Sequence, residues 1–332
     1  MFKNLFFKNK GPISISLIGK VCNFASNTKD NNSKISDVKN LADSTIRDIT
    51  FFNSAKYREQ ASLTKAKFCI TTKNLIKYLP NSCTPILVDN VLLSLSQVTK
   101  LFYPTSITDN FNNHLKVVKK SVIKKNNLQV GKNVLVGKNI SIGKNSFIGY
   151  NTIIEDNVII GKNCSIGSNV ILRNSIVKNN VHILDGCIIG KKGFGFFPNN
   201  GENIRYAHIG CVLINENCEI GAGSTIDRGS LSNTIIGRNT FLDNQVHIAH
   251  NVKIGENCMI AGQVGIAGSS IIGNNVMIGG QAGISGHLII GNNVQIGGGS
   301  GVIKNIPDNA KVIGYPATEI KNFLKEMRNK ND

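Results

Sequence analysis

An aliphatic residue recurs at every sixth position through much of the second half of this chain. One unbroken ladder consists of Ile236, Leu242, Ile248, Ile254, Ile260, Ile266, Ile272, Ile278, Ile284, Ile290, Ile296 and Val302. An earlier ladder consists of Val130, Val136, Ile142, Ile148, Ile154, Ile160, Ile166 and Leu172. An α-helix repeats about every 3.6 residues and a simple strand about every 2, so a strict period of six fits neither. Hexapeptide repetition is typical of a parallel β-helix.

The repeat also predicts the geometry of the solenoid. Three sides of six residues make a coil of eighteen, and hexapeptide solenoids wind left-handed, against the usual rule for crossover connections. Successive coils are expected to pair as parallel strands roughly 4.8 Å apart. The turn in each hexad is often Gly-Lys-Asn, in which Asn tolerates left-handed backbone geometry. Such prisms usually assemble side by side, which favours a homotrimer.

The ladders divide the chain into four parts. Residues 1–105 carry no hexad and mix short apolar runs with polar stretches that suit helices, which predicts a small α/β domain. Residues 106–128 are expected to form a transition with imperfect rungs, followed by the β-helix at 129–304. Residues 305–332 then form a C-terminal helical extension. The expected fold class is therefore mainly β.

A formal net charge of +18 raises the question of nucleic-acid binding. Much of this charge comes from lysines in repeated turns such as 131–133, which are spread around the solenoid. No arginine-rich stripe, zinc-finger spacing or stacking-aromatic motif accompanies the charge, so we expect no nucleic-acid partner. A basic surface favours an acidic protein partner instead.

The eight cysteines predict buried thiols rather than disulfides or a metal site, because no pair has CxxC spacing. Cys164, Cys218 and Cys258 each lie four residues after a ladder aliphatic, in an inward-facing slot. Such small core thiols suit a reducing compartment. Lysines interrupt the apolar N-terminal segment, and no other run approaches membrane-spanning length. We therefore expect no transmembrane segment and a cytoplasmic location.

One edge of the predicted prism departs from the Gly-Lys-Asn pattern. The turn at 249–251 holds His250 in place of Lys, and Gly268 has the same position eighteen residues later. Another eighteen residues give Gly286, with His287 beside it. An imidazole can accept a proton from an attacking nucleophile while a bare backbone N–H stabilises an oxyanion. The column of His250, Gly268 and His287 thus suits acyl transfer.

This column has two other interpretations. Either histidine alone would be an ordinary surface residue at a turn, and their alignment argues against that interpretation. A zinc site is the rival chemistry, since His247 and His250 are close in sequence and His287 shares the edge. However, His247 is predicted on the flat outer side, and no carboxylate or cysteine completes a ligand set within one chain. We therefore expect no metal site, unless a neighbouring subunit supplies ligands.

Five segments together carry a family resemblance. The solenoid contains Ile226-Asp-Arg-Gly-Ser230, Asp243-Asn-Gln-Val-His-Ile-Ala-His-Asn251 and Ile284-Ser-Gly-His-Leu288, and an interruption of the repeat contains Gly193-Phe-Gly-Phe196. The N-terminal part contains Ile49-Thr-Phe-Phe-Asn-Ser-Ala-Lys-Tyr57. With these segments the chain resembles the UDP-3-O-acylglucosamine N-acyltransferases of lipid A biosynthesis over nearly its whole length.

The resemblance implies a specific reaction. A (3R)-3-hydroxyacyl group would pass from acyl carrier protein to the 2-amine of UDP-3-O-(3-hydroxyacyl)glucosamine and give UDP-2,3-diacylglucosamine. The donor would be an acylated phosphopantetheine on the carrier protein, with no other cofactor. By motif, His250 is the general base, the Gly268 N–H supplies the oxyanion hole, and His287 positions the substrate. Asn251 is a further substrate contact, and Asp243 is the carboxylate expected to orient His250.

The same resemblance makes the N-terminal α/β domain a uridine-binding domain. Phe51 and Tyr57 would hold the uracil by stacking, whereas ordinary core packing is the alternative. The family usually has Asn at the position of Ser54, and a hydroxyl group cannot reproduce both ends of an amide. Ser54 is therefore a nucleotide contact that departs from the pattern. Lys191 and Lys192 also depart from it, and no role is predicted for them.

Three alternative functions stay open on the sequence. The UDP-N-acetylglucosamine O-acyltransferase of the same pathway shares the solenoid, lacks this N-terminal domain and typically has His-Asp instead of His250-Asn251. A hexapeptide carbonic anhydrase would require bound zinc. A noncatalytic trimeric scaffold would use the solenoid alone.

Overall fold

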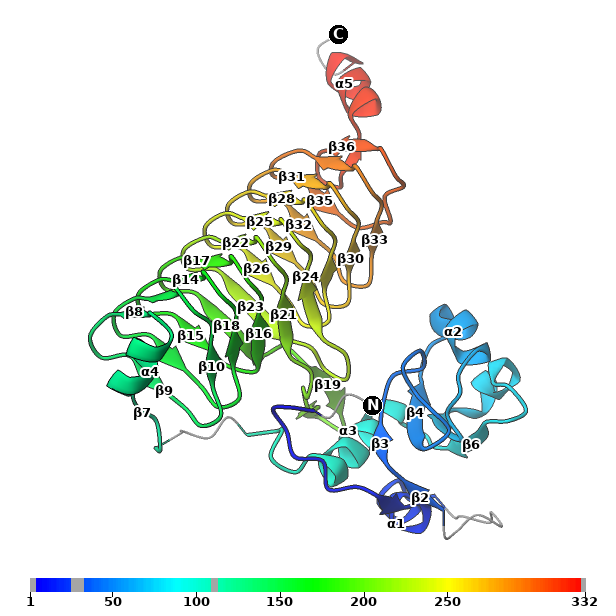
Figure 1. The fold of residues 1–332 in the computed structure, drawn as a ribbon. Coiled ribbons are helices and arrows are strands. Elements are labelled where there is room, and N and C mark those ends of the chain that lie inside the picture. Colours follow the sequence, from blue (N-terminus) through cyan, green and yellow to red (C-terminus); the bar gives the residue numbers. More distant parts are fainter. Residues whose placement is uncertain (1–3, 25–32, 109–112, 330–332) are drawn as a thin grey trace. The chain divides into compact units, whose positions relative to one another are not determined.

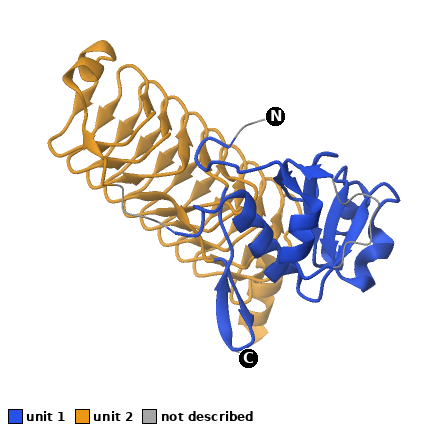
Figure 2. Ribbon diagram, turned by 90° about the horizontal axis from the view of Figure 1, so that it is seen from below, with its two compact units in different colours: residues 1–110, 195–209 blue, residues 111–194, 210–332 orange. Residues whose placement is uncertain are grey.

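The computed structural model describes residues 4–24, 33–108 and 113–329 (Figure 1). The chain divides into two compact units, residues 1–110 with 195–209 and residues 111–194 with 210–332 (Figure 2). The predicted boundary at residue 105 is close to this division, but the sequence did not show that 195–209 belongs to the N-terminal unit. Short parts of the predicted N-terminal domain, transition and C-terminal extension lie outside the described residues.

The first unit is an α/β domain built on a parallel sheet. The strands of this sheet are β3 (Asp37–Val38), β4 (Asp48–Phe52), β5 (Phe68–Thr71) and β6 (Thr84–Leu87). Its helical segments are α1 (Ile15–Val21), η1 (Ala55–Tyr57), α2 (Arg58–Ser62), η2 (Lys73–Tyr78) and α3 (Val91–Phe102). Two antiparallel pairs complete it, β1 (Ile13–Ser14) with β2 (Lys34–Ile35), and β19 (Phe196–Asn199) with β20 (Glu202–Arg205).

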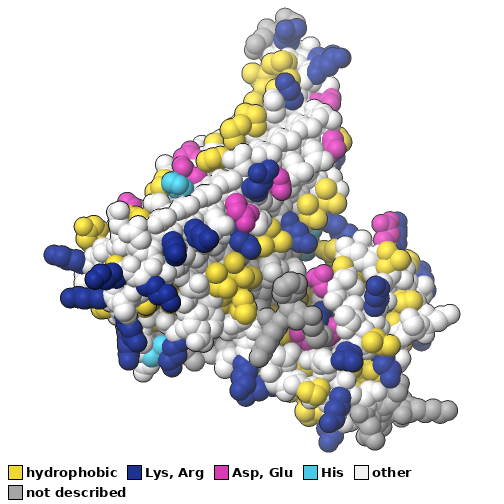
Figure 3. All heavy atoms as spheres, in the orientation of Figure 1, with side chains coloured by type: hydrophobic (Ala, Val, Ile, Leu, Met, Phe, Trp, Pro, Cys, Tyr) yellow, Lys and Arg dark blue, Asp and Glu magenta, His cyan; other side chains and the backbone are white. Residues whose placement is uncertain are grey.

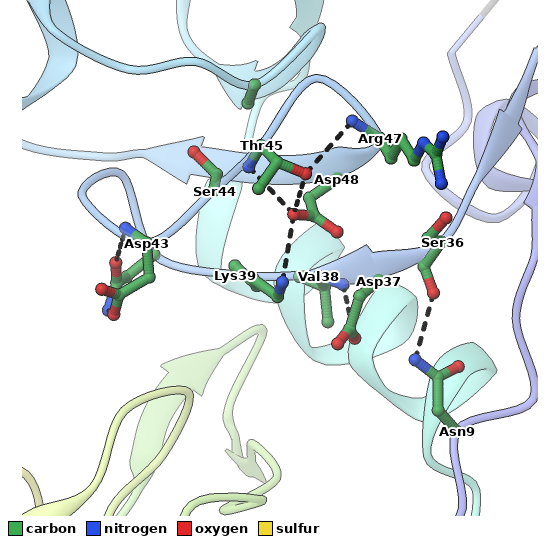
Figure 4. Close-up of polar contacts among 12 residues, drawn as sticks. Asn9, Ser36, Asp37, Val38, Lys39, Asp43, Ser44, Thr45, Arg47 and Asp48 are labelled. Carbon is green, nitrogen blue, oxygen red and sulfur yellow. Dashed lines mark hydrogen bonds and ion pairs between the residues drawn. The ribbon is translucent and has the colours of Figure 1, made fainter. Parts of the chain in front are cut away.

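A buried carboxylate fixes the start of β4. Asp48 is fully buried, and its Oδ2 accepts hydrogen bonds from Lys39 Nζ at 3.1 Å, from the Thr45 N–H at 2.9 Å and from Thr45 Oγ1 at 2.7 Å (Figure 4). A charge without such partners would be costly to bury. These bonds hold the turn that leads into β4, the strand that carries Phe51.

The second unit is a parallel β-helix with three sides. Side 1 contains β10 (Ser141–Ile142), β13 (Ile159–Ile160), β16 (Ser175–Val177), β21 (Val212–Ile214), β24 (Thr234–Ile236), β27 (Lys253–Ile254), β30 (Ile271–Ile272) and β33 (Ile289–Ile290). Side 2 contains β8 (Gln129–Val130), β11 (Phe147–Ile148), β14 (Ser165–Ile166), β17 (His182–Ile183), β22 (Glu219–Ile220), β25 (Phe241–Leu242), β28 (Met259–Ile260), β31 (Met277–Ile278), β34 (Gln295–Ile296), β36 (Lys311–Ile313) and β37 (Thr318–Glu319). Side 3 contains β7 (Lys116–Val117), β9 (Leu135–Val136), β12 (Ile153–Ile154), β15 (Ile171–Leu172), β18 (Ile188–Lys192), β23 (Thr225–Arg228), β26 (His247–Ile248), β29 (Gly265–Ile266), β32 (Gly283–Ile284) and β35 (Gly301–Val302). The prediction of a mainly β fold with stacked parallel strands is confirmed.

The ladder residues form the core of the solenoid. From Ile142 to Leu172 and from Ile236 to Val302, each ladder side chain is at most 5% exposed. Cys164, Cys218 and Cys258 lie in the inward slot, and each Sγ donates a hydrogen bond to a backbone carbonyl of a neighbouring coil at 3.0–3.1 Å. All eight cysteines are free and buried, which confirms the prediction of core thiols.

The two ends of the solenoid are built differently. The described part of the transition predicted at 106–128 contains β7, which pairs antiparallel with β9, and α4 (Lys120–Lys125). Val122 and Ile123 of α4 pack against the solenoid core, so a helix turn covers the open end of the coils. At the other end, β36 adds to side 2 and α5 (Ile320–Asn329) follows. No helix within the described residues has the length and apolar character that crossing a membrane requires.

Candidate active site

Three successive turns between side 3 and side 1 carry the predicted column. His250 follows β26, Gly268 follows β29 and Gly286 follows β32. The Ser269 N–H donates to the His250 carbonyl at 2.9 Å, and the His287 N–H donates to the Gly268 carbonyl at 3.0 Å. These bonds confirm that the three turns stack in register.

The second position of each turn is left-handed. Asn251, Ser269 and His287 have φ angles of 63°, 63° and 60°. His287 thus stacks on Asn251 and Ser269. This column is one residue further along the chain than the column of His250 and Gly268. The side chain of His287 is exposed at this edge, whereas that of His250 is half-buried.

The imidazole of His250 lies between two glycines. A β-carbon on Gly268 would lie 2.8 Å from both Cε1 and Nε2 of His250. A β-carbon on Gly193 would lie 2.8 Å from Cβ of His250 and 3.2 Å from Oδ2 of Asp227. Real β-carbons do not approach other atoms so closely, and therefore the ring can occupy this place only because both residues lack side chains. The Gly193-Phe-Gly-Phe196 segment thus contributes its first glycine to the wall of the site.

Asn251 determines which nitrogen of His250 carries the proton. Its Oδ1 accepts from the Ser230 N–H at 3.0 Å, and its Nδ2 donates to the Ser232 carbonyl at 3.1 Å. A backbone N–H can only donate and a carbonyl can only accept, so these two bonds fix the orientation of the amide. Oδ1 also lies 2.9 Å from Nδ1 of His250. Nδ1 must therefore carry the proton, and the lone pair of the neutral ring is on Nε2.

Asp243 does not have the role expected of it. It lies on the turn after β25, between side 2 and side 3, which is a different edge of the prism from that of His250. Its Oδ1 accepts from the Asn244 N–H at 2.8 Å, and its side chain lines an apolar groove with Phe241 and Met259. Figure 3 shows hydrophobic side chains gathered along this face of the solenoid. The prediction that Asp243 orients His250 is wrong. Asp243 lies one hexad before His250, and in a three-sided prism one hexad leads to the neighbouring edge. Asn251 makes the contact with His250 instead.

An ion pair with a buried carboxylate borders the site and was not predicted from the sequence. Asp227 in β23 lies opposite Lys191 in β18, with Nζ 3.0 Å from Oδ1. The carboxylate of Asp227 is 2% exposed, so Lys191 compensates a charge that would otherwise be costly to bury. His247 lies on the outer face of side 3, where its Nδ1 is 2.7 Å from Thr225 Oγ1. The only sequence signal for this pair was the charged residues within the strand segments.

The metal alternative depends on which side chains surround His247 and His250. Among the described residues, no group of three His, Cys, Asp or Glu side chains is close enough together to hold a metal ion. Nδ1 of His250 faces the amide of Asn251, and His247 has Thr225 Oγ1 2.7 Å from its Nδ1 and Asp227 Oδ2 3.9 Å from its Nε2.

The predicted uridine contacts lie in the first unit, near the carboxyl end of β4. Phe51 is half-buried in that strand, and Ser54 caps η1 by accepting a hydrogen bond from the Lys56 N–H at 3.4 Å. Tyr57 packs against the core around Phe52, and burial raises the pKa of its hydroxyl group. Core packing therefore accounts for part of the Tyr57 surface. The carboxyl edge of a parallel sheet is nevertheless where α/β folds bind ligands.

Comparison with known proteins covers both units. The family profile described as UDP-3-O-(3-hydroxymyristoyl) glucosamine N-acyltransferase matches residues 32–101, and the bacterial transferase hexapeptide profile (six repeats) matches 139–174 and 233–268. The chain is 40% identical over 324 residues to UDP-3-O-acylglucosamine N-acyltransferase 2 of Legionella pneumophila (strain Paris), covering 97% of this chain and 94% of that protein. It is 40% identical over 260 residues to UDP-3-O-acylglucosamine N-acyltransferase of Rickettsia rickettsii (strain Sheila Smith), covering 76% of this chain and 74% of that protein.

A solved structure also resembles the solenoid. The UDP-N-acetylglucosamine acyltransferase of Francisella novicida matches with a TM-score of 0.53 and 23% identity, over 60% of this chain and 73% of that one. At this identity the likeness supports the fold alone.

Proposed function

Because this chain belongs to the UDP-3-O-acylglucosamine N-acyltransferase family and is an acyltransferase, we propose that it acylates the 2-amine of UDP-3-O-(3-hydroxyacyl)glucosamine. The donor is a (3R)-3-hydroxyacyl group carried as a thioester on the phosphopantetheine of acyl carrier protein, and no other cofactor takes part. The product is UDP-2,3-diacylglucosamine, an intermediate of lipid A biosynthesis. The observation that supports this reaction best is the lone pair of His250 Nε2 directly beside the backbone of Gly268.

The proposed mechanism uses these two groups in sequence. As the amine nitrogen forms its bond to the thioester carbon, Nε2 of His250 takes the proton that the amine loses. The Gly268 N–H stabilises the oxyanion of the tetrahedral intermediate. The intermediate collapses by breaking the C–S bond, and the imidazolium of His250 returns the proton to the leaving thiolate. His287, exposed on the adjacent turn, positions the substrate.

The first unit is proposed to bind the uridine part of the acceptor. Phe51 and Tyr57 stack on the uracil, and Ser54 makes a polar contact at the start of η1. The match of the family profile to residues 32–101 and the location of these residues at the carboxyl edge of the sheet support this assignment.

Assembly and location complete the proposal. We take the coils to wind left-handed and the chain to form a homotrimer, as the hexapeptide repeat favours. Phe241, Met259 and Met277, which are 42%, 51% and 44% exposed along side 2, support a subunit contact there. The net charge of +18 suits an acidic carrier protein as partner. The free buried thiols support a location in the reducing cytoplasm.

The test measures acyl transfer from hydroxyacyl-carrier protein to UDP-3-O-acylglucosamine. The His250→Ala variant is expected to lose about 10²- to 10⁴-fold in kcat because it lacks the base. Lys253→Ala is the control, since Lys253 is exposed on the outer face of side 1, away from the proposed subunit contact, and its removal should leave kcat unchanged. Full activity of His250→Ala would remove the general base from the mechanism.

The alternatives have their own outcomes. A wild-type protein that acylates UDP-N-acetylglucosamine but not UDP-3-O-acylglucosamine would favour the O-acyltransferase. Stoichiometric zinc in the purified protein would favour the carbonic anhydrase.

A further inference from the structure

Eight turns within the described part of this solenoid share a backbone cap. The N–H of the first turn residue, the position of Lys in Gly-Lys-Asn, donates to the side chain at the same position one coil later. The acceptor is always Asn, Asp or Ser. The pairs are Lys138 with Asp156, Tyr150 with Ser168, Lys162 with Asn179, Ser168 with Asp185, Ala222 with Asn244, Glu256 with Asn274, Asn274 with Asn292, and Asn292 with Asp308, at 2.5–3.1 Å.

On the candidate catalytic edge this cap is missing at the Gly268 turn, as it is among the described residues at the Gly262 and Gly280 turns of the neighbouring edge, where the next coil again has Gly. Gly268 occupies the donor position, and Gly286 occupies the position that would supply the acceptor. Within the described ranges, the Gly268 N–H donates no hydrogen bond. The cap is possible on this edge, because the Lys138 N–H donates to Asp156 earlier along it, at 2.6 Å. The Gly268 N–H is therefore open because residue 286 has no side chain.

The two glycines are required for different reasons. At Gly268 a β-carbon would meet the imidazole of His250 at 2.8 Å, so a side chain there displaces the ring. At Gly286 the nearest atom to a β-carbon would be the Gly268 carbonyl oxygen, at 3.2 Å, and the next would be Cβ of Ala267 at 3.9 Å. A side chain at 286 thus needs only a small shift, and its φ lies outside the left-handed region. Neither space nor backbone geometry demands glycine at 286.

We infer that Gly286 is a positioning residue that keeps the Gly268 N–H available to the oxyanion. This inference rests on the proposed acyl transfer. An Asn at 286 would form the same cap as these eight turns, occupy the Gly268 N–H and remove the oxyanion donor. In this role the native Gly286 does not contact the reacting atoms and acts only through Gly268.

The experiment compares Gly286→Asn with Gly286→Leu and Gly286→Ala. Leu has nearly the shape of Asn but no acceptor, and Ala adds only the β-carbon. We expect Gly286→Asn to lose about 10²- to 10³-fold in kcat, the usual effect of losing one oxyanion donor, with KM for the acceptor nearly unchanged. Leu should lose at least about tenfold less, and Ala less again. Because the cap adds a hydrogen bond, Gly286→Asn should also melt at a higher temperature than Gly286→Leu.

Three outcomes decide the matter. Equal loss of kcat in the Asn and Leu variants would overturn the inference, because steric obstruction would then explain both. A crystal structure of Gly286→Asn in which Oδ1 does not bond the Gly268 N–H would overturn it as well. A wild type that transfers no acyl group would instead refute the proposed function, which is therefore tested separately.

Discussion

The contact between Asn251 and His250 supports a quantitative prediction. Asn251→Gly removes the Oδ1 atom that lies 2.9 Å from Nδ1 of His250. Glycine adopts the φ of 63° at this turn without strain, so the backbone should keep its conformation. The variant therefore removes the group that selects the tautomer and rotamer of His250, and leaves the imidazole itself in place.

The expected magnitude follows from that hydrogen bond. A hydrogen bond of this kind contributes roughly 0.5–1.5 kcal/mol net, and about 1.4 kcal/mol corresponds to a tenfold change in a population. Without Asn251, the fraction of His250 with its lone pair on Nε2 and its ring on Gly268 should fall by about 2- to 13-fold. We expect kcat to drop by the same factor, with KM for the acceptor little changed. Stability should fall by about 1–3 kcal/mol, since the Ser230 N–H and the Ser232 carbonyl lose their partner.

A double-mutant cycle separates orientation from general loosening. Steady-state acyl transfer is measured for Asn251→Gly, His250→Ala and the double variant, with circular dichroism to check folding. If Asn251 acts through His250, its removal should have no further effect in the His250→Ala background. Effects that multiply in the double variant would refute the argument, and so would full kcat in a folded Asn251→Gly. Asn251→Ala is the matched control: it should match the glycine variant in kcat and be less stable by about 1 kcal/mol, because its β-carbon strains the left-handed turn.

Two further predictions concern the nucleotide contact and the thiols. Ser54→Asn introduces the amide that is usual in the family, and Asn can also cap η1 at this position. We expect this variant to bind UDP about tenfold more tightly in calorimetry. Unchanged or weaker binding would remove Ser54 from the nucleotide site. Burial raises the pKa of Cys218 to about 11 from its usual 9.0, so the native thiols should react slowly with a thiol reagent at pH 8 and fast after unfolding. Because the native protein holds this proton more tightly than the unfolded chain, the free energy of unfolding should decrease as the pH rises from about 9 to 11. Rapid labelling of the native protein would contradict the burial of these thiols.

The periodic part of the chain was predictable because each coil repeats the same local rule. Between 236 and 302 the hexad has no insertion, so counting eighteen residues places His250, Gly268 and Gly286 on one edge. The same counting explains the buried cysteines. It failed for Asp243, because a residue seven positions before His250 lies on the neighbouring turn of a three-sided prism.

The sequence alone determined the solenoid, its core and the column of catalytic candidates, since a strict repeat converts position in the chain directly into position in space. Tertiary structure alone decided how the side chains are paired. Asp227 meets Lys191 across interruptions of the repeat, where counting gives no register. Asn251 orients His250 because Ser230 and Ser232 fix its amide, and those residues come from an irregular loop. Hydrogen bonds depend on direction at the scale of single atoms, and that direction exists only once the coils are stacked.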